Sequence, residues 1–132
     1  MNKFKLALLV SGVALALSGC QTLNPQDIHT TASKQTIETA KKQITATQNK
    51  AYDLAVYDNG VIYIKFKKPP GRNWATAQNN EASYRISCQN FRSFVDQGMV
   101  VDINFQGGAT QQYNQHRCET ETPTNFYSNW KK

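Results

Sequence analysis

The stretch "YDLAVYDNGVIYIKF", residues 52–66, decides the fold because it contains every part of a β-hairpin. Tyr52, Leu54 and Val56 alternate on one face of its first half, with the period of two that is typical of a strand. The letters "DNG" at 58–60 favour a tight turn, since Asn and Gly tolerate positive φ angles. "VIYIKFKK" follows as a second strand, and "PPGRN" ends it because proline has no N–H for the ladder.

A helix is predicted after this hairpin, over about residues 78–90. Apolar side chains recur there at steps of four, three and four, which places one apolar face on a helix: Tyr84, Cys88, Phe91 and Val95. Gly98 then breaks the pattern.

A second pair of strands follows the helix. "MVVDINF", residues 99–105, alternates in the manner of a strand, and "QGGAT" turns the chain. "QQYNQHRC", residues 111–118, is predicted as a fourth strand. Its many polar residues indicate a position at the edge of the sheet or on a solvent-exposed face. This strand would carry Cys118 back toward Cys88.

Residues 30–50 contain no Gly or Pro and are predicted as an N-terminal helix, which Thr31 or Ser33 can cap. Its apolar stripe is narrow and has near-helical spacing: Ala32, Ile37, Ala40 and Ile44, with Ala51 as an extension. Such a helix docks lightly on the domain or awaits a partner, and the pattern leaves both open. The element order predicts an α+β fold, a small two-layer domain in which two helices cover an antiparallel sheet of about four strands.

The first nineteen residues have the three-part pattern of a bacterial export signal. Lys3 and Lys5 precede an apolar run, 6–17, and small residues lead to Cys20. The run is too short for a membrane-spanning helix, which needs about 20 residues. The ending "LSGC" resembles the lipobox of bacterial lipoproteins, and the alternative is an ordinary signal peptide with a chance cysteine.

The resemblance to lipoproteins implies that residues 1–19 are removed as a signal peptide and that Cys20 receives lipid. Several acyl chains, palmitate among them, would anchor the chain firmly, since each buried methylene adds about 0.8 kcal/mol. Gln21, in place of Asp, implies sorting to the outer membrane by the lipoprotein sorting machinery. Residues 20–29, polar and interrupted by Pro25, are predicted to be a flexible lipidated tether.

Three cysteines leave one pair once Cys20 is assigned to lipid. Cys88 and Cys118 would face the oxidising periplasm, where paired thiols form disulfides. A bridge closing about thirty residues is worth roughly 3–4 kcal/mol in the chain-entropy model. The alternatives are a nucleophilic cysteine and a zinc site at His116 and Cys118, but no second ligand pair accompanies "HRC". We therefore predict a disulfide and no metal.

Charge and motifs point away from nucleic acid and from catalysis. The net charge is +6, and its densest piece, "KFKKPPGR" at 65–72, is a solvated strand end or an anion site. The two histidines, His29 and His116, lie in no triad motif. "GRN" and "QGGAT" lack the Lys-Ser/Thr of a phosphate loop. We predict no enzyme, no catalytic residues, no cofactor and no nucleic-acid partner, whereas Trp74 and Trp130 stay open as core residues or ligand platforms.

The whole layout resembles the small pilotin lipoproteins of the bacterial type II secretion system, in the AspS-type (GspS-beta) branch. Four features carry the resemblance: the lipobox, the polar helix "ASKQTIETAKKQ", the hairpin "YDLAVYDNGVIYIKF", and a helix ending at Cys88 followed by "QGMVVDINFQGGATQQYNQHRC". It covers most of the mature chain up to Cys118. The tail from Glu119 lies outside it. The resemblance implies that residues 30–132 form one pilotin-like α+β domain.

A pilotin binds the C-terminal segment of a secretin subunit (GspD-type in type II secretion), a short amphipathic helix, and guides it to the outer membrane, where the secretin ring assembles. The resemblance therefore implies a helix-binding groove, a lipid-anchored location on the periplasmic face of the outer membrane, and no chemical step. The candidate groove residues carry apolar side chains, which are equally suited to a core: Ile37, Ile44, Phe91, Phe94, Val95 and Val100.

Two other functions remain open at this point. A periplasmic inhibitor lipoprotein, such as a lysozyme inhibitor, is also small, anchored and disulfide-bonded, but proteins of that kind are mainly β-barrels. A cell-wall enzyme that uses His116 is the other, although no motif in the sequence requires it.

Overall fold

The computed structural model describes residues 24–121, and it confirms the predicted α+β class. Five strands form one sheet in the order β1-β2-β3-β4-β5. They are β1 (Thr47–Gln48), β2 (Tyr52–Val56), β3 (Val61–Phe66), β4 (Val100–Phe105) and β5 (Thr110–Tyr113). The helices are η1 (Pro25–Asp27), α2 (Lys34–Gln43), α3 (Thr76–Arg85), η2 (Ile86–Asn90), α4 (Arg92–Asp96) and α5 (Gln115–Thr120). Within the described part of the chain, no helix is long and apolar enough to cross a membrane.

The predicted β2–β3 hairpin is confirmed. Tyr52 lies opposite Phe66, and Leu54 lies opposite Ile64 in an antiparallel register. The turn closes where the Tyr57 amide donates to the Val61 carbonyl at 2.8 Å, and Gly60 adopts a φ of 92° that other residues rarely reach.

The prediction that the sheet is wholly antiparallel is wrong at its centre, because β3 pairs in parallel with β4, with Val61 beside Val100 and Phe66 beside Phe105. The connection between these strands contains α3, η2 and α4. A helical crossover of this length carries the chain from the end of β3 back to the end of the sheet at which β3 began. The next strand, β4, therefore runs in the same direction as β3.

Two predicted elements end earlier than expected. The N-terminal helix covers Lys34–Gln43 rather than 30–50, and Thr47 and Gln48 form β1, an additional strand. β-branched side chains at Ile44, Thr45 and Thr47 disfavour further helix and suit a strand. The predicted strand at 111–118 ends at Tyr113. Cys118 instead lies on α5, whose first turn is capped where the Asn114 side chain accepts from the Arg117 amide at 2.9 Å.

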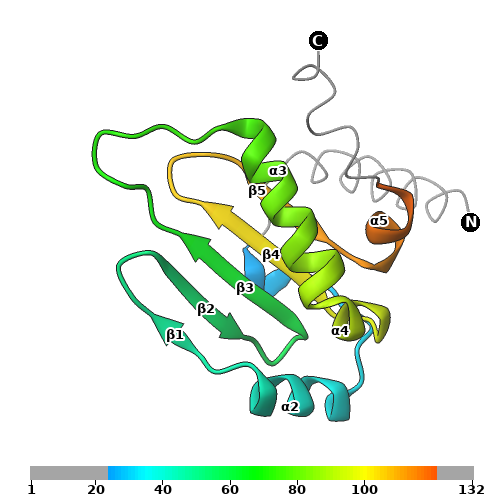
Figure 1. Cartoon of the computed structure of the whole chain (residues 1–132). Coiled ribbons are helices and arrows are strands. Elements are labelled where there is room, and N and C mark those ends of the chain that lie inside the picture. Colours follow the sequence, from blue (N-terminus) through cyan, green and yellow to red (C-terminus); the bar gives the residue numbers. More distant parts are fainter. Residues whose placement is uncertain (1–23, 122–132) are drawn as a thin grey trace, which may run out of the picture.

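Helices lie on both faces of the sheet, and the main helix layer covers one of them (Figure 1). α3 and α4 lie on one face, and η1 lies on the other. Between the helix layer and the sheet sits the core, which is built from the inward side chains of the strands and helices: Ala40, Ile44, Ile62, Ile64, Phe94, Val95, Met99, Val101, Ile103, Phe105 and Tyr113. The predicted two-layer arrangement is thereby confirmed.

The packed chain begins before the predicted domain boundary at residue 30. The side-chain amide of Asn59 donates to the carbonyls of Pro25 and Ile28, at 2.9 and 3.0 Å, and Ile28 is buried. Residues 25–28 are therefore held against the hairpin turn. The predicted tether thus includes residues that belong to the fold.

The outer edge of β5 is covered by a side chain of its own domain. Arg117 donates to the Gln112 carbonyl at 2.8 Å and to the Gln111 side chain at 2.9 Å, and its guanidinium stacks 3.9 Å from the centre of the Tyr113 ring. Glu121 accepts from the same guanidinium at 2.7 Å and holds it in place.

Candidate functional site

The helix layer leaves part of the apolar sheet face uncovered. α3 lies over β4 and β5, whereas no helix of the described chain lies over β1 and the middle of β2 (Figure 1). α2 lies at the turn end of the hairpin, where Lys41 contacts Asp58, and Ala40 of this helix belongs to the core against which Leu54 and Val56 pack. The sheet is thus wider than the helices that cover it.

Four apolar side chains occupy this uncovered area, and we call them the β2 stripe: Tyr52, Leu54 and Val56 of β2 with Phe66 of β3. All four are half-buried, whereas Ile62 and Ile64 on the same face of β3 are buried. The stripe is about 13 Å long at the usual rise of a strand. It therefore presents an apolar strip that a partner could bury.

Aromatic rings extend the stripe across the sheet. The Tyr52 and Phe66 ring centres lie 6.2 Å apart, and Phe66 stacks on Phe105 of β4 at 5.3 Å. Trp74 meets Phe105 edge-on at 5.2 Å. Such contacts fix ring orientations, so this end of the sheet offers a rigid surface.

The six predicted groove residues do not come together on one surface. Ile37, Ile44, Phe94 and Val95 are buried, with at most 8% of each residue exposed, and they pack within the domain. Phe91 is half-buried against the core. Val100 is also half-buried, and with Val95 it borders a hollow of about 220 Å³ that also includes His29 and His116.

The predicted disulfide is confirmed. Cys88 and Cys118 are bonded, with their Cα atoms 5.3 Å apart, and the bridge joins η2 to α5. It therefore fixes the short C-terminal helix to the helix layer. Cys20, the predicted lipid attachment site, lies outside the described residues, as does Trp130.

The opposite face of the sheet carries a buried carboxyl. Asp102 of β4 is 1% exposed and lies opposite Tyr63 and Gln112 on the neighbouring strands. Burial raises its pKa to about 6, and a hydrogen bond from Gln112 partly opposes that shift. Tyr57 and Tyr63 stack 5.7 Å apart nearby, and burial raises the pKa of each phenol.

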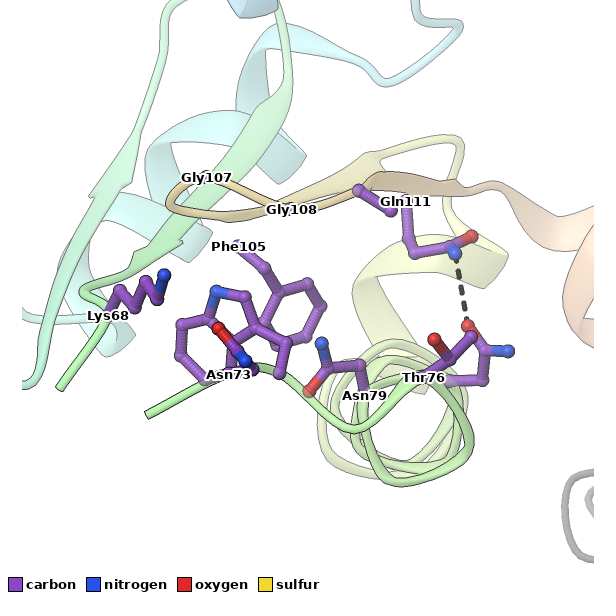
Figure 2. A pocket seen from close by; sticks show the side chains of 11 residues that line it. Lys68, Asn73, Thr76, Asn79, Phe105, Gly107, Gly108 and Gln111 are labelled. Atoms are coloured by element: carbon purple, nitrogen blue, oxygen red, sulfur yellow. Dashed lines mark hydrogen bonds between the residues drawn. The ribbon is translucent and has the colours of Figure 1, made fainter. Parts of the chain in front are cut away.

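A polar cavity lies beyond the aromatic row (Figure 2). The start of α3, the loop after β3 and the β4–β5 turn enclose about 400 Å³. Trp74 and Phe105 form its apolar wall. The sequence left Trp74 open as a core residue or a ligand platform, and in the structure it both packs against the core and lines this cavity. In residues 24–121, no three His, Cys, Asp or Glu side chains are placed to hold a metal ion.

Comparison with known proteins finds no matching family, no matching curated protein and no matching solved structure. The function is therefore inferred from the residues and their geometry. The β2 stripe was missed by the analysis of the sequence, although a signal for it exists. The signal is the alternation of Tyr52, Leu54 and Val56, which gives the first strand of the hairpin an apolar face that a neighbouring element must bury.

Proposed function

We propose that the chain is a pilotin-type outer-membrane lipoprotein that binds the C-terminal helix of a type II secretin and guides its targeting and assembly. The observation that carries the proposal is the β2 stripe, an apolar strip left open beside the helix layer. An amphipathic helix is the natural partner of such a strip, because it would complete the layer that α3 begins.

The dimensions of the stripe fit a short helical segment. A strip of about 13 Å matches roughly nine helical residues at 1.5 Å each. Such a segment presents apolar side chains at positions i, i+3 or i+4, and i+7 to the sheet. Tyr52, Leu54 and Val56 would meet these anchors, with Phe66 at their side.

The remaining features support the same proposal. The lipobox at Cys20 supplies an address in the outer membrane, and the disulfide rigidifies a domain that performs no chemical step in this function. The inhibitor alternative fits less well. A β-barrel would be expected for it, whereas residues 24–121 form an open five-stranded sheet with a helix layer.

The test measures binding of fluorescent peptides from secretin C-termini by anisotropy. We expect Leu54→Lys to weaken binding at least about tenfold, because losing a central apolar anchor costs about 1.4 kcal/mol or more. Ala55→Lys is the matched control. Ala55 is the next residue of the same strand, half-buried on the opposite face of the sheet.

Circular dichroism and thermal unfolding establish that both variants are folded. Equal weakening by the two substitutions would contradict docking on the β2 stripe. Failure of the unmodified chain to bind any secretin C-terminal peptide would contradict the pilotin proposal itself.

A further inference from the structure

The cavity beside Trp74 has the composition of a binding site, and no part of the proposed pilotin function uses it. Its walls come from two segments that are distant in sequence: residues 68–80, which include the first turns of α3, and residues 105–111, which include the turn that joins β4 to β5. Its volume of about 400 Å³ lies in the range of small-molecule sites.

The apolar wall of this cavity is rigidly held. The indole N–H of Trp74 donates to the Gln106 carbonyl at 2.8 Å, and the ring meets Phe105 edge-on. Gly108 allows this approach, because a Cβ built there would lie 2.9 Å from Cδ1 of the indole. The turn and the tryptophan are thus fitted to each other.

The polar wall is unengaged. The side chains of Lys68, Asn73, Thr76 and Asn79 make no hydrogen bond or ion pair to another described residue, and all four line the cavity. In Figure 2 the amide of Asn79 points from α3 toward Phe105. Next to it, the Gln111 side chain donates to that of Asn80 at 3.1 Å. Several amides that can both donate and accept therefore face one aromatic wall.

We propose that this cavity binds a short saccharide that carries acetamido groups. A sugar ring has an apolar C–H face, which suits Trp74, and a rim of hydroxyl groups, which suits side chains that donate and accept together. An acetamido group matches the amide of Asn79, since each amide offers the other a donor and an acceptor. Lys68 is the single charged residue among those that line the cavity, so a polyanion is a poorer match.

The probe is N,N′-diacetylchitobiose, titrated into the full isotope-labelled chain and followed by two-dimensional amide NMR. We expect the indole N–H signal of Trp74 and the side-chain amide signals of Asn79 to shift and saturate. Cellobiose has the same β-1,4-linked pair of sugar rings but no acetamido groups, and we expect it to bind about tenfold more weakly, which corresponds to the loss of one or two hydrogen bonds.

Asn79→Ala tests the polar wall without disturbing the helix, because the Asn79 backbone carbonyl that accepts from Ser83 is unchanged. We expect it to weaken diacetylchitobiose binding about tenfold. Gln78→Ala, an exposed neighbour on the same helix that does not line the cavity, should leave binding unchanged.

Trp74→Ala should abolish the saturating shifts if the variant is folded. If it does not fold, the binding measurement on Asn79→Ala tests the proposal. No saturating shift at the cavity with diacetylchitobiose, or unchanged binding in Asn79→Ala, would overturn the proposal. Equal affinity for cellobiose would overturn the assignment of the acetamido group.

Discussion

At the scale of single residues, the buried carboxyl of Asp102 makes stability depend on pH. Its carboxyl is buried on the face of the sheet opposite the helix layer, and one oxygen, Oδ1, has no hydrogen-bond partner in the described chain. Because its pKa rises from 3.8 to about 6 on folding, the native state binds this proton more tightly than the unfolded chain does. Its contribution to stability is therefore complete below about pH 4 and is lost as the pH rises through about 6.

Asp102→Asn removes this titration and keeps the size of the side chain. We expect the variant to exceed the original chain in free energy of unfolding by about 1–3 kcal/mol near pH 7, with the difference vanishing near pH 4. Urea unfolding of both chains across this pH range measures the difference. A gap that stays constant with pH would mean that the Asp102 carboxyl does not titrate in this way.

At the scale of elements, α3 begins without a side-chain cap. Ala75 occupies the N-cap position with φ and ψ of −92° and 115°, the extended conformation that capping residues adopt. Ala75→Asp supplies the missing acceptor, and we expect it to stabilise the domain by about 1 kcal/mol in urea unfolding. Ala75→Leu, which cannot cap, should give no gain, and a gain of equal size from it would exclude capping as the cause.

The disulfide is the second element-scale feature, because it joins η2 to α5. We expect the double variant Cys88→Ser, Cys118→Ser to lose about 3–4 kcal/mol of unfolding free energy. The unmodified chain in excess reductant should lose a similar amount, which separates the covalent link from the effect of the serines. If reduction left the stability unchanged, the link would contribute nothing to the folded state.

Local patterns predict elements better than they predict pairing. The "DNG" turn and the alternation of Tyr52, Leu54 and Val56 were sufficient for the β2–β3 hairpin. The parallel pairing of β3 with β4 was missed, because alternation within a strand is the same for either direction. The physical signal lay in the connection, which contains helical residues and is too long for a hairpin.

At the scale of the whole molecule, the prediction concerns the lipid anchor. Cys20→Ala removes the thiol that the proposed function requires to be acylated. Because this position lies outside the described residues 24–121, we expect the domain to keep its stability. We expect secretin subunits to remain in the inner membrane in cells that carry this variant. Membrane fractionation and assays of secretin multimers measure the outcome, and normal multimers in the outer membrane would contradict it.

The candidate site belongs to the same scale, which explains why the sequence predicted it poorly. Ile37, Ile44, Phe94 and Val95 have the periodicity of contact residues, and the structure uses them in the core. Periodicity indicates that a side chain is buried but not whether its neighbour belongs to the same chain. The uncovered area depends on the width of the sheet relative to the helix layer, a property of the assembled fold.

The guanidinium that covers β5 has a consequence for crowded conditions. A free strand edge offers a template on which a second molecule can add its own strand, and repeated addition leads to fibres. Arg117 already occupies the carbonyl of Gln112 on that border, and the opposite border is the two-residue strand β1. At high local concentration we therefore expect the molecules to stay monomeric instead of joining through their strand edges.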